Sequence, residues 1–150
     1  MRNLVLITFD SVRADHCSFL GYRRETTPTL KFLAMNGLCF ENAIVTGPGT
    51  PTSMAGVFTG SYTPIYGMNI NEWRRFFESR VTLAEILRFK GYNTVAFNTN
   101  PYTLRLFVFD KGFLYYNDFI EKSVFANSSR KWSIIELLVD FINKKGIFIS

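Results

Sequence analysis

The sequence contains few of the residues that build several common kinds of site. Its 150 residues include two cysteines, Cys17 and Cys39, and one histidine, His16. The cysteines lack the spacing of a zinc motif, and a histidine-rich metal centre is excluded. A Ser-His-Asp triad would have to use His16, which we read as a loop or surface residue. We expect both thiols to be reduced, with a disulfide between them as the alternative.

The sequence has no hydrophobic run long enough to cross a membrane. The apolar segment 4–9 is too short for a spanning helix and has no small-residue cleavage site after it. We therefore interpret it as a strand and not as a signal peptide. The sequence predicts a cytoplasmic protein without a membrane span.

The charged residues do not form one strong cluster. Lys and Arg outnumber Asp and Glu by 17 to 12, but they are scattered along the chain. This distribution does not favour nucleic acid binding, whereas an anionic substrate suits the positive net charge. With 47% hydrophobic residues, we expect residues 1–150 to form a single domain, and the 16 phenylalanines indicate an aromatic surface that needs a large partner layer.

Apolar runs with strand and helix spacing alternate along the chain, and polar or glycine residues separate them. We predict strands at 4–9, 38–40 (extended by 43–45), 94–97 and 147–149, and helices at 29–36, 50–60, 82–90 and 133–145, the last ending at Gly146. Residues 61–79 read as mostly loop, and the aromatic stretch 107–116 remains unassigned. This alternation predicts an α/β fold: an open, mostly parallel sheet with helices on both faces.

Three polar clusters lie where ligands bind in such sheets, at the carboxyl ends of predicted strands. Asp10 could bind a hard metal ion or cap the turn that follows it. Thr50, before Pro51, could lie beside a bound tetrahedral anion at a helix N-terminus or serve only as the N-cap. Asn100, our candidate substrate-binding residue, could equally be an ordinary turn residue. The residue pattern leaves both readings of each open.

The clusters occur in an order that resembles the N-terminal part of sulfatases, in the alkaline-phosphatase superfamily. The segment Thr50–Gly60 looks like the nucleophile helix of that family, which ends in Thr-Gly. Collinear similarity is also found at Asn3–His16, Gly21-Tyr22, Thr27–Leu30, Phe40–Ala43, Thr82–Leu87, Gly91–Thr94, Asn100-Pro101, Gly112-Phe113 and Asp118-Phe119. The resemblance covers most of the chain and implies an alkaline-phosphatase-like fold.

The resemblance also implies a function and a site. It suggests a metal-dependent hydrolase of sulfate or phosphate esters, with Asp10 as a metal ligand and Thr50 at the nucleophile position. The ion would be divalent: calcium, magnesium, manganese or zinc. Many sulfatases instead have Cys or Ser at that position, with Pro two residues later and Arg four later. Here Thr52 and Met54 follow, so formylglycine chemistry is not expected, and a threonine nucleophile resembles phosphodiesterase relatives.

Two further departures affect the expected substrate and partner. Ser11 replaces a second carboxylate, and the region of Asn98–Asn100 lacks a Lys-x-His pair; both count against arylsulfatase activity. The family fold is longer and takes its other metal ligands from its later half, so we expect a truncated domain completed by a C-terminal half or by a homo-oligomer. The alternative functions are a phosphoglycerol-type transferase or phosphodiesterase, and a non-catalytic remnant that acts as a binding module.

Overall fold

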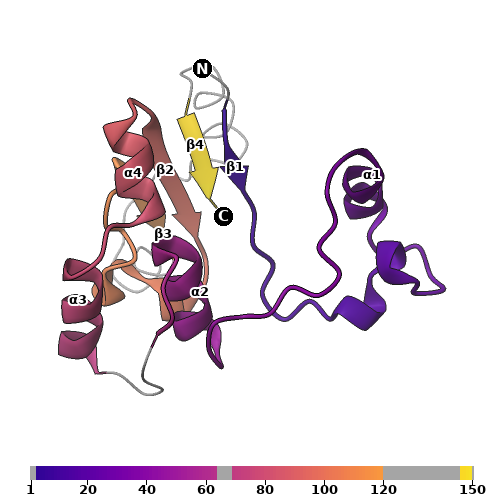
Figure 1. Ribbon diagram of the computed structural model, residues 1–150, viewed down its shortest axis with the longest axis horizontal. Helices are drawn as coiled ribbons and strands as arrows, with labels where there is room; N and C mark the ends of the chain where they lie inside the picture. Colours follow the sequence, from indigo (N-terminus) through magenta and orange to yellow (C-terminus); the bar gives the residue numbers. More distant parts are fainter. Residues whose placement is uncertain (1–2, 64–68, 120–145, 150) are drawn as a thin grey trace, which may run out of the picture. The chain divides into compact units, whose positions relative to one another are not determined.

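The computed structural model describes residues 3–63, 69–119 and 146–149 (Figure 1). The chain divides into two compact units: unit 1 is Met1–Thr8 with Thr46–Ser150, and unit 2 is Phe9–Val45. The single domain over 1–150 stays a prediction, and the predicted helix 133–145 lies outside the described residues. In the described part of the chain, no helix is both long and apolar enough to span a membrane.

Unit 1 contains a parallel sheet. Its described strands are β1 (Val5–Leu6), β2 (Asn93–Asn98), β3 (Tyr115–Asp118) and β4 (Gly146–Ile149), in the order β1-β4-β2-β3. Each neighbouring pair is parallel. The predicted strands at 94–97 and 147–149 are confirmed. The first strand is shorter than predicted, because only its two residues pair with β4, and β3 was not predicted.

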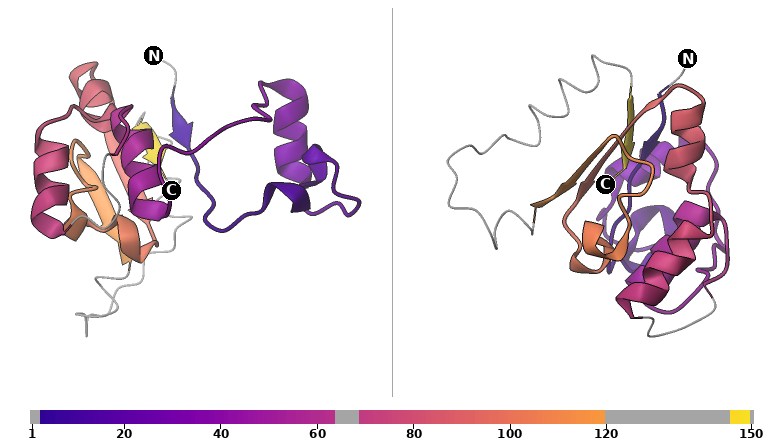
Figure 2. Two further views of the ribbon diagram at one scale, coloured as in Figure 1. Left: turned by 60° about the horizontal axis from the view of Figure 1, so that its bottom comes forward. Right: turned by 90° about the vertical axis from the view of Figure 1, so that its left-hand side faces the viewer.

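Helices pack on this sheet, which confirms the predicted α/β class. Unit 1 contains α2 (Thr50–Thr59), α3 (Ile70–Glu78), α4 (Leu83–Phe89) and the short 3-10 helices η3 (Pro101–Thr103) and η4 (Arg105–Phe107). The described α-helices of unit 1 lie on the same side of the sheet (Figure 2, right), and helices on its other face stay a prediction. Helix α4 contacts β2 and α2, whereas α2 also contacts η3 and α3 contacts η4.

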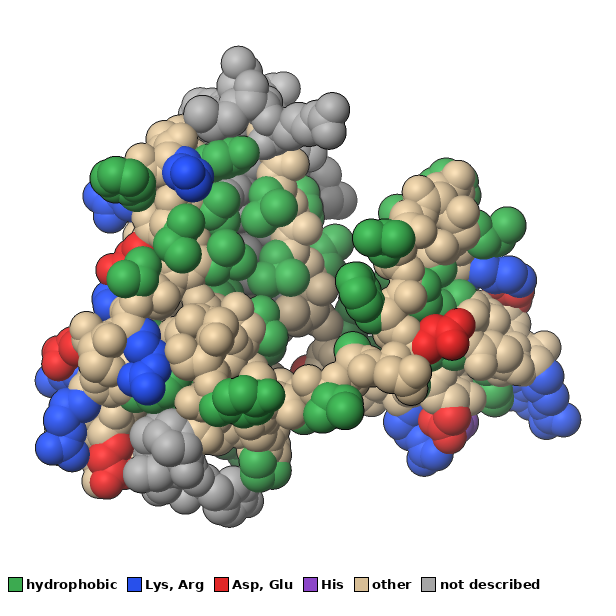
Figure 3. Space-filling view, viewed as in Figure 1, with side chains coloured by type: hydrophobic (Ala, Val, Ile, Leu, Met, Phe, Trp, Pro, Cys, Tyr) green, Lys and Arg blue, Asp and Glu red, His purple; other side chains and the backbone are tan. Residues whose placement is uncertain are grey.

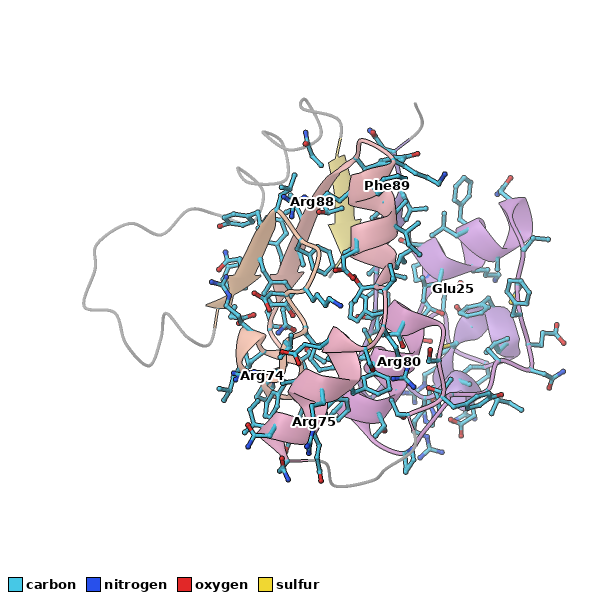
Figure 4. The ribbon with its side chains drawn as sticks, turned by 60° about the vertical axis from the view of Figure 1, so that its left-hand side comes forward. Glu25, Arg74, Arg75, Arg80, Arg88 and Phe89 are labelled. Atoms are coloured by element: carbon cyan, nitrogen blue, oxygen red, sulfur yellow. The ribbon has the colours of Figure 1, made fainter. Side chains whose placement is uncertain are left out.

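Aromatic residues of α3 form much of the core of unit 1. Trp73, Phe76 and Phe77 are buried, and the rings of Phe77 and Phe109 lie 5.0 Å apart between centroids. Arg74 and Arg75 of the same helix are exposed and point outward (Figure 4). The loop predicted for 61–79 is therefore wrong over Ile70–Glu78, where helical spacing of apolar residues decides the structure.

Paired hydrogen bonds begin both α3 and α4. The Asn69 side chain accepts hydrogen bonds from backbone N–H groups of α3, while the Glu72 carboxylate accepts one from Asn69 N. In α4, Glu85 N donates to Thr82 Oγ1 (3.2 Å), and Thr82 N donates to the Glu85 carboxylate (2.9 Å). The predicted helix start at Thr82 and its end near Lys90 are confirmed.

Unit 2 is a smaller arrangement of short helices. It contains the 3-10 helices η1 (Ala14–His16) and η2 (Ser18–Leu20) and the α-helix α1 (Pro28–Asn36), which confirms the helix predicted at 29–36. The strand predicted at 38–40 with its extension 43–45 is wrong: these residues have no regular structure. A strand needs a neighbour for its hydrogen bonds, and unit 2, described in full, has none.

Candidate functional site

Thr50 is the first residue of α2, where its side chain is half-buried. The N-cap is Gly49, one residue before the predicted cap, with φ 80° and ψ 161°. Only glycine adopts this backbone conformation without strain, so the chain enters the helix through Gly49 and places Thr50 and Pro51 in the first turn. The predicted helix is thus confirmed and its predicted N-cap is wrong by one residue.

The first turn of α2 presents backbone donors beside the Thr50 hydroxyl. The first helical hydrogen bond runs from Ser53 N to Gly49 O at 3.1 Å. The N–H groups of Thr50 and Thr52 precede that bond, and Pro51 has none. Because the N-terminus of a helix also has the positive end of its dipole, this turn favours an anionic group near Thr50.

Thr52 joins this turn to the preceding loop. Its side chain is buried, and its hydroxyl donates hydrogen bonds to Pro48 O and to Gly49 O, the latter at 3.0 Å. Its own carbonyl accepts from Thr46 Oγ1 at 3.5 Å and from Thr63 Oγ1 at 3.3 Å.

Two glycines let this loop pack directly on α2. A Cβ at Gly56 would overlap the Thr46 hydroxyl and lie 2.8 Å from Thr46 Cβ. A Cβ at Gly47 would lie 2.9 Å from Thr52 Cβ and 3.1 Å from Thr63 Oγ1. The two glycines are therefore required by close approach, and they keep the loop in contact with the first two turns of the helix.

The predicted cluster after β2 lies at the carboxyl end of the sheet. Asn98 is paired in register with Asp118 of β3, and its side-chain amide donates to Asn100 O (3.1 Å) and Thr103 O (2.9 Å). The Asn100 side chain accepts from Tyr102 N at 2.9 Å and caps η3. Because α2 contacts η3, the structure brings the Thr50 helix and the Asn100 loop together in unit 1 (Figure 1).

A buried polar network supports the Asn98 loop. Asp118 is 4% exposed and accepts hydrogen bonds from Arg105 N (2.9 Å) and Asn98 Nδ2 (3.4 Å). Tyr116 donates from its hydroxyl to Thr103 O (2.5 Å), and its pKa is raised by burial first and by the negative charge of Asp118 second. The sequence did not predict Asp118 and Tyr116 as part of the site. Each is a common residue in an aromatic stretch, and only the register of β2 with β3 shows their role.

Asp10 belongs to unit 2, so the structure does not place it in the same compact unit as Thr50. Its side chain is exposed, and the Ser11 hydroxyl donates to it at 3.4 Å. Ser11 has φ 60°, a left-handed conformation that is uncommon for serine. This backbone turns the chain sharply directly after Asp10.

The turn after Asp10 is held by exposed ion pairs. The guanidinium of Arg13 donates two hydrogen bonds to the Asp15 carboxylate, at 2.9 and 2.6 Å, and lowers the pKa of that carboxyl. His16 Nδ1 lies 3.0 Å from the same carboxylate, and the His16 ring packs on Tyr22 at 4.7 Å between centroids. His16 is exposed, which confirms the reading of it as a surface residue.

The described residues do not form a complete metal site. Within them, no group of three or more His, Cys, Asp or Glu side chains is suitably placed for a metal ion. Asp10 offers one carboxylate, a donor that hard divalent ions prefer, but such ions take six or more oxygen ligands. The described donors are too few to hold such an ion.

The parallel sheet and the helices packed on it define an α/β protein. The sulfatase family model matches residues 2–133, and the chain belongs to the sulfatase family. It is 33% identical over 92 residues to the ulvan-active sulfatase of Formosa agariphila (strain DSM 15362 / KCTC 12365 / LMG 23005 / KMM 3901 / M-2Alg 35-1). That match covers 61% of this chain and 18% of the relative, so the chain spans a minor part of the curated protein it matches.

Two solved structures have a similar fold, both of the C-terminal periplasmic domain of EcEptC from Escherichia coli. The one in complex with Zn has a TM-score of 0.62 and 21% identity, covering 99% of this chain and 42% of that chain. The other has a TM-score of 0.61 and 20% identity, covering 99% and 41%. At these identities the likeness shows the fold alone.

Proposed function

We propose that this chain provides the nucleophile of a metal-dependent hydrolase of sulfate or phosphate esters. The observation that carries the proposal is the position of Thr50, in the first turn of α2 beside backbone donors, within a segment that matches the sulfatase family. Asp10 would be one metal ligand and Asn100 would contact the substrate; both roles stay predictions.

The chemistry follows from that position. The Thr50 oxygen would attack the phosphorus or sulfur atom as its hydroxyl proton passes to solvent, and the bond to the ester oxygen would break, so that the alcohol leaves with that oxygen and takes up a proton from solvent. Water would then cleave the threonine ester and release the inorganic anion. The N–H groups of Thr50 and Thr52 would stabilise negative charge on the non-bridging oxygens. Many sulfatases use formylglycine as the nucleophile. A threonine at that position instead favours phosphate esters as the substrates.

The proposed activity depends on a divalent ion that the described residues alone would not hold. Calcium, magnesium, manganese and zinc are the candidates, and zinc gains some support from the similar domain solved with Zn. The further ligands would come from the rest of a longer fold or from a second subunit. Cytoplasmic location, an anionic ester as substrate and the absence of nucleic acid binding also stay predictions. On the face shown in Figure 3, basic side chains lie among acidic ones, and this mixture supports the proposal that the chain does not bind nucleic acid.

The test measures metal content and the hydrolysis of aryl phosphodiester, phosphomonoester and sulfate substrates by the purified chain. We expect Thr50→Ala and Asp10→Asn to abolish turnover, whereas Glu25→Gln, which alters an exposed carboxylate of unit 2 (Figure 4), should leave it unchanged. Turnover that persists in Thr50→Ala would remove the role assigned to Thr50. Adding glycerol tests the transferase alternative, because a transferase would form a glycerol ester in place of inorganic phosphate.

A further inference from the structure

The buried threonine two residues after Thr50 has no role in the proposed reaction. We propose that Thr52 is a positioning residue for Thr50: its hydroxyl holds the Pro48 and Gly49 carbonyls and so fixes the turn that places the Thr50 hydroxyl. This inference rests on the proposed function of Thr50.

The Thr52 hydroxyl is fully used inside the protein. It is 4% exposed as a residue, and its single proton lies between Pro48 O and Gly49 O, which is 3.0 Å away. A nucleophile must reach the substrate, and Thr52 cannot do so without breaking these bonds. The two threonines therefore have distinct roles: Thr50 is accessible, and Thr52 holds the backbone before it.

The backbone carbonyl of Thr52 is also held by hydrogen bonds. Its carbonyl accepts from Thr46 Oγ1 (3.5 Å) and Thr63 Oγ1 (3.3 Å), so the hydroxyls of two other segments converge on it. The close approach at Gly47 and Gly56 leaves no room for the loop to slide along α2. Thr52 thereby links the loop before Thr50 to a rigid helix, at both its side chain and its carbonyl.

Loss of the Thr52 hydroxyl should release the Gly49 end of the first turn. Gly49 O then keeps the hydrogen bond from Ser53 N (3.1 Å) but loses the one from Thr52, and Gly49 lacks a side chain that could restrict the backbone. Since a displacement of about 1 Å at a reacting group can cost roughly 100-fold in rate, the effect should appear in kcat more than in KM.

The test compares three variants of the full chain on the best ester substrate. Thr52→Val removes the hydroxyl, and Thr52→Ser retains it. Thr59→Val is the matched control: it removes the same kind of bond, from Thr59 Oγ1 to Ala55 O (2.7 Å), at the other end of α2. We expect kcat to fall by roughly 10- to 100-fold in Thr52→Val, with KM changed less than about threefold. Thr52→Ser and Thr59→Val should stay within about threefold of wild type.

Hydrogen exchange at the Ser53 amide gives a second readout that needs no turnover. We expect it to be at least about tenfold faster in Thr52→Val and unchanged in Thr52→Ser. Unchanged kcat in Thr52→Val, or an equal loss in Thr59→Val, would overturn the positioning role. If the wild-type chain has no turnover, the proposed function of Thr50 fails. Exchange then decides alone: a rate in Thr52→Val equal to wild type overturns the role of Thr52, and a faster rate supports it.

Discussion

Different interactions stabilise unit 1 and unit 2. Unit 1 has an aromatic core in which rings from α2, α3 and the segment after η4 contact one another, with Phe77 almost completely buried. In unit 2, which is described throughout, Cys17 is the one buried residue. Hydrogen bonds between Ser18 and Thr27 and the exposed pair of Lys31 with Glu25 hold its short helices.

This difference bears directly on the two site residues. Thr50 lies on a helix fixed by buried packing, so its position should survive changes of salt and pH. Asp10 precedes a turn whose ion pairs are exposed, and such pairs contribute little and weaken in salt. We therefore expect single changes in the core of unit 1 to lower stability strongly, and single changes in the turn of unit 2 to have small effects.

The largest effect is expected at Phe77. Phe77→Ala should lower the free energy of unfolding of unit 1 by about 3–5 kcal/mol, because it leaves a cavity among the rings of Trp73, Phe76 and Phe109. Urea denaturation followed by tryptophan fluorescence measures this. Phe89→Ala is the control, since Phe89 is 92% exposed at the end of α4 (Figure 4), and it should change stability by less than about 0.5 kcal/mol. Equal losses would contradict the aromatic core.

A second large effect is expected where the loop packs on α2. Gly56→Ala should destabilise the protein by about 1–3 kcal/mol, because its methyl group would overlap the Thr46 hydroxyl. Thr46→Ala removes that hydroxyl and should restore part of the loss in the double variant. Thermal denaturation of the four proteins of this cycle gives the coupling energy, which should exceed about 0.5 kcal/mol. Strictly additive effects would mean that the two residues do not touch.

The cap of α4 should give an intermediate effect. Thr82→Ala removes the acceptor for Glu85 N and the donor to Lys111 O (3.0 Å), and should cost about 1 kcal/mol in the free energy of unfolding. Thr82→Ser preserves the hydroxyl and should cost clearly less, as measured by urea denaturation. A Thr82→Ser variant as unstable as Thr82→Ala would assign the effect to packing of the methyl group.

The smallest effect is expected in the turn after Asp10. Arg13 lowers the pKa of Asp15, so the pair stabilises the fold above the ordinary Asp pKa of about 3.9 and loses this contribution as pH falls through the lower folded value. A carboxyl-carbon NMR titration should give a midpoint below about 3.9 for Asp15. Arg13→Gln or high salt should raise it. A midpoint unaffected by Arg13→Gln would show that the pair does not form in solution.

Local signals predicted the elements whose ends are set by a few residues. The capping box of Thr82 and Glu85, the helix that stops at Gly37 and the mostly apolar run Thr94–Phe97 each specify their element within a short window. Helix α3 had the same kind of signal, Asn69 with Glu72 followed by apolar residues at helical spacing, but the proline and glycine earlier in the segment outweighed it. The wrong strand at 38–40 shows the reverse case, in which a strand-like run has no partner.

The site was predictable to a similar extent. Thr50 was found because its helix has a recognisable start and matches a family pattern. Thr52 and Asp118 were not, because the importance of Thr52 comes from its hydrogen bonds to Pro48 O and Gly49 O and that of Asp118 from its bond with Arg105 N, and residue spacing shows none of these contacts. Whether Asp10 and Asn100 act as a metal ligand and a substrate contact stays a prediction.

Peptide mass spectrometry of the chain, quenched during reaction with an aryl phosphodiester, tests most directly whether Thr50 is the nucleophile. If Thr50 is the nucleophile, we expect a phosphoryl ester on Thr50 that is present in wild type and absent in Thr50→Ala. A modification on Thr52 or another residue, or turnover without any ester on Thr50, would contradict the claim that Thr50 is the nucleophile.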